Sequence, residues 1–428
     1  MKAHRWVQAV LALITMVMIS PYEYTFTVFE QPIAKAHHWP LPSVALTFTI
    51  YVIVSSLFMI PSGYWSDRLQ PRWLTTAAGI MAGLGWIGCA YASSPWMLYL
   101  AYGAGSLGPG YVYASNINDA LKWFPEANKR GVAVGLIDMG FGLGSAVFIP
   151  ILSGIIKHAP GGYHSGFLYV GIAMLVVIVI VAQFQRFPGK NWKPEGYDPK
   201  REEEAERQRK TRVHHASHAF TVGEVLRTWQ YWVALLSLTL ITAAGLMVAA
   251  HIVDMGSVVA AVGAAAAVAA ATYSRVSNGV MRWAAGRLSD SIGRELSMLI
   301  WFVVCGVAIA AMAFAHSGWL FITLAVIALG GWGPLFSLFP ALVGDYWGRG
   351  HSGVDYGILY GPGKAMGGVF GGLIAASIYS ATHSWNSDFY LAGGFAVGAG
   401  ILAILLHPPR GERQAAKETT TQPQQRAA

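Results

Sequence analysis

The feature that most constrains this chain is a series of long apolar stretches separated by short polar loops. We count twelve such stretches, each of about 20 residues or more, which is the length that an α-helix needs to cross a bilayer. Inside the hydrocarbon core each backbone polar group must be hydrogen-bonded within the protein, and a helix achieves this within one segment. The pattern therefore predicts an all-α membrane protein with twelve transmembrane helices.

The composition agrees with this prediction. Only 12% of the 428 residues are charged, against about 25% in an ordinary soluble domain. The first apolar stretch is too long for a signal peptide and has no small-residue cleavage site, so we expect it to be retained as the first helix. Neither cysteine belongs to a disulfide or metal-binding pattern.

The net charge of +8 is distributed unevenly along the chain. When alternate loops are assigned to the two sides of the membrane, one side receives 24 of the 29 Lys and Arg residues, and the other receives only Lys35 and Lys157. This bias is the positive-inside signal, which predicts that both termini are cytoplasmic. The basic charge therefore reflects topology, and we expect no nucleic-acid partner; the lipid bilayer is the expected surrounding.

A long polar stretch divides the apolar stretches into six and six. We assign residues 1–187 to an N-terminal half, 188–227 to a cytoplasmic central loop and 228–410 to a C-terminal half. Residues 411–428 are polar and are predicted to form a disordered cytoplasmic tail.

The two halves contain a repeated loop. The stretch GYWSDRLQPR (63–72) follows the second apolar stretch and GRLSDSIGR (286–294) follows the eighth, with the Gly and the Asp each matching at an offset of 223. A Gly allows two helix ends to approach, and an Asp at a helix end can be held by a basic residue or by a neighbouring helix N-terminus. We predict gate motifs formed by Gly63, Asp67, Arg68, Gly286, Asp290 and Arg294.

Three cations lie inside apolar stretches: Arg275, Arg282 and Lys364. A charge at the bilayer centre costs at least about 2.5–3.5 kcal/mol on insertion scales, so such residues usually serve function. Asn278 lies one helical turn before Arg282 on the same face, and the guanidinium fork matches a carboxylate. We predict an anion site at Arg282 and Asn278; the alternative is that Arg282 reaches the interface or pairs with Asp290.

The other two cations allow several interpretations. Arg275 is either a second cation that attracts anions, a partner of an acid, or a group that reaches the outer interface. Lys364 follows Pro362, which predicts a kinked or locally open helix. There the lysine either points into a central cavity or is satisfied by freed carbonyl groups.

Two acids lie in the same environment, Glu23 and Asp138. They are candidate proton carriers, because burial favours the neutral form of a carboxyl group. The alternative is structural pairing with Arg275, Arg282 or Lys364. His251 and Asp254 are expected to reach the outer interface, without a role.

Aromatic residues supply further candidates. A tyrosine hydroxyl can donate to a carboxylate while its ring forms the wall of a site. The predicted substrate-binding aromatics are Tyr24, Tyr360, Tyr356 and Trp332. The sequence has no nucleophile–base motif, no phosphate-binding loop and no metal-ligand spacing, so we expect neither an enzyme nor a cofactor or metal, and transport must be secondary.

The six-plus-six pattern, the central loop and the repeated loops resemble the major facilitator superfamily, although Gln70 replaces the usual Gly of the first loop. Further stretches resemble the oxalate:formate antiporter family and related bacterial monocarboxylate transporters: NDALKWFPEANKRGVAVG (118–135), TVGEVLRTWQYWV (221–233), SNGVMRWAAGRLSDSIGR (277–294) and LFSLFPALVGDYWG (335–348).

This resemblance implies two six-helix pseudo-repeat halves around a central cavity. It implies a monomeric transporter in a bacterial inner membrane that carries small carboxylate anions by alternating access, in an oxalate:formate type of exchange. The alternative is proton-coupled symport of a monocarboxylate such as lactate, pyruvate or formate. In that family an arginine at the position of Arg282 binds the substrate carboxylate, and a lysine occurs in the helix of Lys364, whereas uncharged residues stand at positions 23 and 138.

Overall fold

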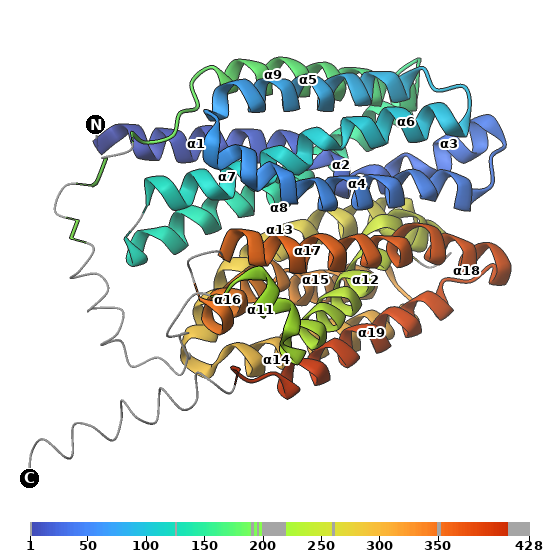
Figure 1. Ribbon diagram of the computed structural model, residues 1–428. Coiled ribbons are helices and arrows are strands. Elements are labelled where there is room, and N and C mark those ends of the chain that lie inside the picture. The colour runs from blue at the N-terminus through green and yellow to red at the C-terminus, as the bar shows by residue number, and fades with distance from the viewer. Residues whose placement is uncertain are drawn as a thin grey trace, which may run out of the picture.

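The computed structural model describes residues 2–124, 126–189, 192–194, 197–198, 220–258, 262–348 and 352–409. Within these ranges the secondary structure is helical, without a strand (Figure 1). The predicted disordered tail, 411–428, and much of the predicted central loop lie outside the described residues. Among the described residues, ten helical segments are long and apolar enough to cross a membrane, which confirms the all-α membrane fold.

The N-terminal half begins with a helix that is interrupted several times. Its elements are α1 (Lys2–Ile19), α2 (Pro21–Tyr24), the 3₁₀ helix η1 (Phe26–Val28), α3 (Glu30–His37), α4 (Leu41–Arg68), α5 (Pro71–Ala90), α6 (Pro95–Gly105), α7 (Leu107–Trp123), α8 (Ala127–His158) and α9 (Tyr163–Ala182).

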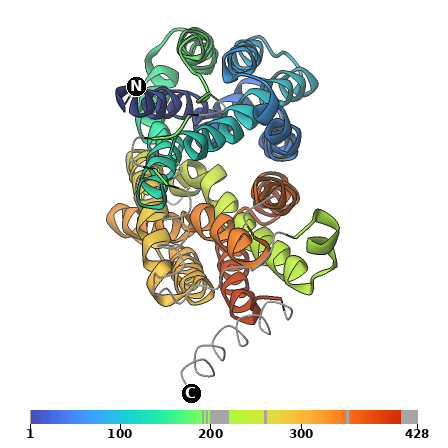
Figure 2. The ribbon, with the colours of Figure 1, turned by 60° about the vertical axis from the view of Figure 1, so that its left-hand side comes forward.

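The C-terminal half has the same general organisation. Its elements are α11 (Val222–Arg227), α12 (Trp229–Val258), α13 (Ala264–Ile292), α14 (Arg294–Met312), α15 (Gly318–Trp332), α16 (Leu335–Trp347), α17 (Ser352–Val369), the π-helical η2 (Phe370–Ile374), α18 (Ala375–Thr382) and α19 (Asn386–Leu405). Figures 1 and 2 show the N-terminal helices grouped on one side of the C-terminal helices. Between the halves, α4 packs on α17 and α8 packs on α13.

Length and apolar composition identify ten spans among the described residues, two fewer than the twelve predicted. The ten candidate spans leave out α13 and the α6–α7 pair. α13 carries Arg275, Asn278 and Arg282, and these groups lower its apolar content while its 29 residues remain long enough to span. The count of twelve therefore stays a prediction.

Several helices are interrupted along their length. The first helix breaks between Ile19 and Pro21, and α6 and α7 meet at Ser106. Pro21 has no N–H group to continue the helical ladder. Pro362 lies inside α17, which continues past it as a helix, and the irregular segment in this region is instead the π-helical turn of η2. Interrupted backbone at membrane depth is tolerated where it is buried in protein or lines a cavity, so these breaks point to a site.

Candidate functional site

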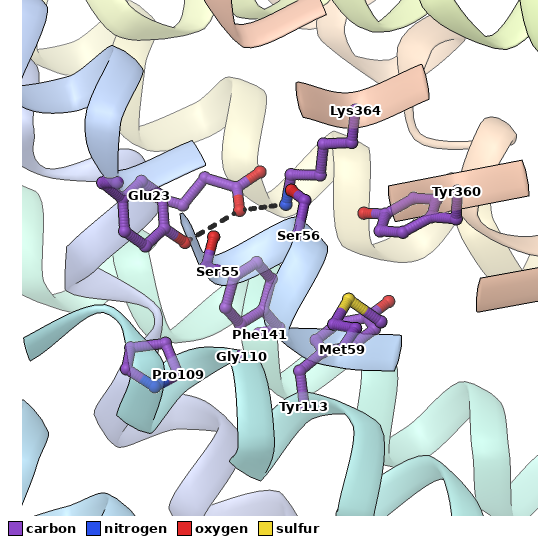
Figure 3. Close-up of a pocket in the computed structure, with 11 residues that line it drawn as sticks. Glu23, Ser55, Ser56, Met59, Pro109, Gly110, Tyr113, Phe141, Tyr360 and Lys364 are labelled. Carbon is purple, nitrogen blue, oxygen red and sulfur yellow. Dashed lines mark hydrogen bonds and ion pairs between the residues drawn. The ribbon is translucent and has the colours of Figure 1, made fainter. Parts of the chain in front are cut away.

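A small pocket lies between the halves and has about 270 Å³ of empty volume, including its open part. Most of its wall comes from the N-terminal half, and α17 adds the remainder (Figure 3). The lining residues are Glu23, Tyr51, Ser55, Ser56, Met59, Pro109, Gly110, Tyr113, Phe141, Tyr360 and Lys364.

One ion pair forms part of the pocket wall. The Lys364 ammonium lies 2.5 Å from Glu23 Oε2, and the Tyr51 hydroxyl donates to the same oxygen at 3.0 Å (Figure 3). The other oxygen, Glu23 Oε1, is buried and has no hydrogen-bond partner among the described residues. Because Glu23 belongs to α2 and Lys364 to α17, this pair joins the two halves across the pocket.

A second ion pair joins the halves outside the pocket lining. Arg282 Nη1 on α13 lies 2.8 Å from Asp138 Oδ1 on α8. The Tyr113 hydroxyl donates to the same oxygen at 2.8 Å. Since Tyr113 also lines the pocket, it connects the pocket to this pair.

Arg282 is held by several further groups. Its Nη2 donates to the Tyr24 hydroxyl at 3.1 Å and to Asn278 Oδ1 at 2.9 Å. Asn278 is itself fixed, because its Nδ2 donates to the Leu329 carbonyl at 3.0 Å. The guanidinium carbon lies 3.8 Å from the centre of the Phe336 ring, a cation–π contact. Arg282, Asn278 and Tyr24, which were all predicted to bind substrate, therefore form one cluster, and Arg282 does not reach Asp290.

Arg275 lies about two helical turns before Arg282 on the same helix and is fully buried. Its guanidinium stands 4.4 Å from the centre of the Tyr24 ring, and Nη2 donates to the Ala249 carbonyl at 3.1 Å. Its Nε and Nη1 have no hydrogen-bond partner among the described residues. Of the alternatives for Arg275, reaching the outer interface is wrong, and a buried cation without an acidic partner in the described part of the chain fits the structure.

The predicted aromatics surround these charges. The Tyr360 ring lies 5.6 Å from Lys364 Nζ and 5.0 Å from the Tyr356 ring, and Trp332 contacts Tyr24 edge-on at 6.3 Å. The Tyr356 hydroxyl and Trp332 Nε1 are buried donors with no partner within the described ranges. Sequence reasoning missed Tyr51 and Phe336, since each is one of many aromatics in an apolar stretch and nothing in its spacing marks it.

The gate motif of the C-terminal half forms a latch within that half. Arg294 lies 2.7 Å from Asp290 and 3.0 Å from Asp345, so a basic residue holds the motif Asp. A Cβ at Gly286 would make an ordinary contact with Ser337.

The N-terminal copy of the motif differs. A Cβ at Gly63 would meet nothing within 4 Å, so the expected close approach of helices there is wrong for this conformation. The side chains of Asp67 and Arg68 lie outside the described residues.

His251 and Asp254 require a correction. Both were expected to reach the interface, but their exposed fractions are 0% and 3%. They contact α3 of the N-terminal half, where His251 Nδ1 lies 2.8 Å from Glu30 Oε2. The apolar length of α12 gave no sign that its polar end would be covered by another segment.

Comparisons with known proteins agree with the fold. The family model described as Major Facilitator Superfamily matches residues 11–361 and 254–427. The chain is 30% identical to the oxalate:formate antiporter of Oxalobacter formigenes over 99% of this chain and 96% of that protein. It is 24% identical to monocarboxylate transporter 13 of Rattus norvegicus over 80% and 75% of the two chains. A bacterial homolog of the human lysosomal transporter Spinster has a similar structure, with a TM-score of 0.63 at 14% identity, covering 95% of this chain and 96% of that one.

Proposed function

The chain belongs to the major facilitator superfamily, and from this premise we propose that it is a secondary active transporter of small carboxylate anions. The observation that carries the proposal is the charge arrangement between the halves. Arg282 and Lys364 come from the C-terminal half, and each is paired with a carboxylate of the N-terminal half, Asp138 and Glu23. A substrate carboxylate has the chemistry needed to replace either internal carboxylate.

Alternating access follows from where these pairs lie. They connect the halves near the helix breaks, at the interface about which the halves of this fold rock. When a substrate carboxylate takes the place of Glu23 at Lys364, the cation stays compensated while the interface rearranges. Leaving a buried charge unpaired costs several kcal/mol, about 3–5 in soluble proteins, so the halves move most easily while each cation is paired, with a substrate carboxylate or with its internal acid.

Exchange of the oxalate:formate type is the first specific form. It is supported by the full-length similarity to the Oxalobacter formigenes antiporter. In this form the two cations bind the two carboxylates of a dianion, after Glu23 and Asp138 leave them, and a monoanion returns in the opposite direction.

Proton-coupled symport of a monocarboxylate is the second form, and the ion pairs favour it. Because Glu23 and Asp138 already compensate Lys364 and Arg282, the empty carrier is able to close without burying those cations unpaired. A substrate anion that displaces one acid leaves that carboxylate to take up one proton. The substrate and the proton then cross together with no change in the charge of the site.

The test is transport by the purified full-length protein in liposomes. Labelled oxalate exchanging against internal formate or oxalate, without dependence on an imposed proton gradient, supports exchange. Uptake of lactate, pyruvate or formate that follows an imposed proton gradient supports symport. The proposal fails if the protein neither binds nor transports any carboxylate of one to four carbons while it remains folded and monodisperse.

A further inference from the structure

A second buried charged cluster lies away from the pocket, where α3 of the N-terminal half meets α12 of the C-terminal half. It consists of Glu30, His251 and Asp254, whose exposed fractions are 0%, 0% and 3%. One ligand atom from each lies within 4.8 Å of the others. Figure 1 shows α3 at the end of the molecule opposite the N-terminus, which the charge pattern of the loops predicts to be the outer side.

The His251 ring faces a hydrogen-bond acceptor on both sides. Nε2 lies 3.3 Å from the Gly372 carbonyl, and Nδ1 lies 2.8 Å from Glu30 Oε2. In a neutral ring that donates from Nε2, the Nδ1 lone pair points at a carboxylate oxygen, and two acceptors repel unless a proton or a metal ion lies between them. A donated N–H to a backbone carbonyl is the usual arrangement around a metal-ligating histidine.

The cluster also has an excess of carboxylate groups. Glu30 Oε1 is buried with no hydrogen-bond partner among the described residues, and the same holds for both oxygens of Asp388, which interacts electrostatically with His251. Asp388 is fully buried. The protein supplies one imidazole against three acids here, so a cation is the ligand that would satisfy the free oxygens.

We propose that Glu30, His251 and Asp254 bind a divalent transition-metal ion of the Zn²⁺ class. Imidazole together with carboxylates is a ligand set for such ions, whereas Mg²⁺ and Ca²⁺ prefer oxygen ligands alone. One Zn²⁺ with neutral His251 and two carboxylates gives zero net charge. Gln31, which is not one of the proposed ligands, donates a long hydrogen bond from Nε2 to Asp254 Oδ2 at 3.5 Å.

The ion would tie the two halves together at this end. Glu30 belongs to the N-terminal half, and His251 and Asp254 belong to α12 of the C-terminal half. Opening this end would separate the three ligands. Bound Zn²⁺ therefore stabilises the state in which this end of the protein is closed, and so inhibits transport. The inhibition rests on the proposed transport function, but the binding of the metal does not.

Binding is tested on the purified full-length protein in detergent, freed of metal and titrated with ZnCl₂. We expect one Zn²⁺ per chain, an unfolding temperature that rises with Zn²⁺ concentration, and no comparable effect of Mg²⁺. Glu30→Gln and Asp254→Asn, which are nearly isosteric, should each weaken Zn²⁺ binding by about tenfold or more. The control is His37→Gln on α3, because His37 contacts Tyr163 and lies outside the cluster; it should bind as the wild type does.

A second measurement keeps the proposal testable if the variants fail to fold. Zinc-edge X-ray absorption of the wild-type complex should show nitrogen and oxygen ligands with one imidazole. The proposal is overturned if the wild type does not bind Zn²⁺, if two or more imidazoles or a sulfur ligand are found, or if both folded variants keep wild-type affinity. Zn²⁺ binding without any effect on transport would overturn the inhibition alone.

Discussion

The ion pairs Lys364–Glu23 and Arg282–Asp138 both join the halves near the pocket, and they have the same charge composition and different surroundings. Arg282 contacts Asp138, Tyr24 and Asn278, and stacks on the Phe336 ring. Lys364 is hydrogen-bonded to Glu23, with the Tyr360 ring 5.6 Å away. Glu23 and Lys364 line the pocket, whereas Arg282 and Asp138 do not.

We call Arg282–Asp138 the held pair, because several groups fix its cation, and Lys364–Glu23 the accessible pair, because it lines the pocket. Arg282 is preorganised by a shell that fixes the plane of its guanidinium, so moving it requires rearrangement of several groups. Lys364 is a flexible ammonium at the pocket with few partners. We infer that an entering carboxylate meets Lys364 first and that Arg282 takes part after Tyr113 or Asp138 has moved.

The largest effect is expected for Arg282→Gln. It removes carboxylate binding and also leaves Asp138 buried without its cation, which costs about 3–5 kcal/mol in soluble proteins. The unfolding temperature should fall and substrate binding should be lost. Adding Asp138→Asn should restore most of the unfolding temperature but not the binding. Wild-type carboxylate affinity in the folded double variant would show that Arg282 serves only structure.

A smaller, substrate-dependent effect is expected for Lys364→Ala. A charge-assisted hydrogen bond contributes about 1.5–3 kcal/mol, which corresponds to roughly 10–100-fold in affinity. If Lys364 contacts the second carboxylate, oxalate binding falls by this factor and formate binding falls less. Equal losses for oxalate and formate, measured on the same preparation, would contradict a two-carboxylate site.

The third change tests the acids as a matched pair, Glu23→Gln against Asp138→Asn. Each keeps the side-chain shape and removes the proton site. If the accessible pair carries the proton, Glu23→Gln abolishes proton-driven uptake but leaves exchange of labelled substrate across the membrane intact. Asp138→Asn should then retain proton-driven uptake. If instead Asp138→Asn abolishes proton-driven uptake and Glu23→Gln retains it, the proton is carried by the held pair.

Much of this arrangement was predictable because polar residues in apolar stretches are few. Arg282, Asn278 and Lys364 were recognisable because charge at membrane depth is costly, and helical spacing placed Asn278 beside Arg282. The pairing of the acids was left open, since which helices face each other is decided by packing of the halves and not by local sequence. The repeat offset of 223 also relates Arg282 to Met59, which lines the pocket, although Met59 itself carried no chemical signal.

The misjudged features share a physical cause. Gly63, His251 and Asp254 were interpreted from the sequence around each of them. Their surroundings, however, are decided by which other helices pack against them. α3 covers the polar end of α12 and buries His251, which no periodicity in α12 indicates. The family resemblance implies the halves and the cavity, but it does not indicate partners for Glu23 and Asp138, where the family has uncharged residues.

A smaller effect is expected from removing one hydroxyl at each pair. Tyr51 donates to Glu23 at 3.0 Å and Tyr113 donates to Asp138 at 2.8 Å. Tyr51→Phe removes a contact from the accessible pair, which has few others. It should change substrate affinity more than Tyr113→Phe, because Asp138 then stays paired with Arg282, which further groups hold in place. Affinities for one monocarboxylate, measured side by side, check this order; a larger effect of Tyr113→Phe would indicate that Tyr113 contacts the substrate itself.

The smallest effect should come from a pair near the surface, Arg5 and Glu126, 2.8 Å apart between α1 and the start of α8. Partial burial raises the pKa of Glu126, but hydrogen bonds from Arg5, its own backbone and Lys129 outweigh it, so this pKa lies below its ordinary value. A lowered carboxyl pKa contributes stability that is present above the unfolded value, about 4.3, and is lost as the pH falls through the folded value.

Arg5→Gln should therefore lower the unfolding temperature slightly near pH 7 and reduce its dependence on pH below about 4.3. A pair near the surface contributes about 0–1 kcal/mol and is weakened by salt. Because both side chains of this pair are still 12% exposed, the difference from wild type should shrink at high ionic strength. The corresponding difference for Arg282→Gln should persist in salt, because the Arg282 side chain is only 2% exposed. If salt reduced both differences equally, the site around Arg282 would be open to ions, and the contrast between a held and an accessible pair would not stand.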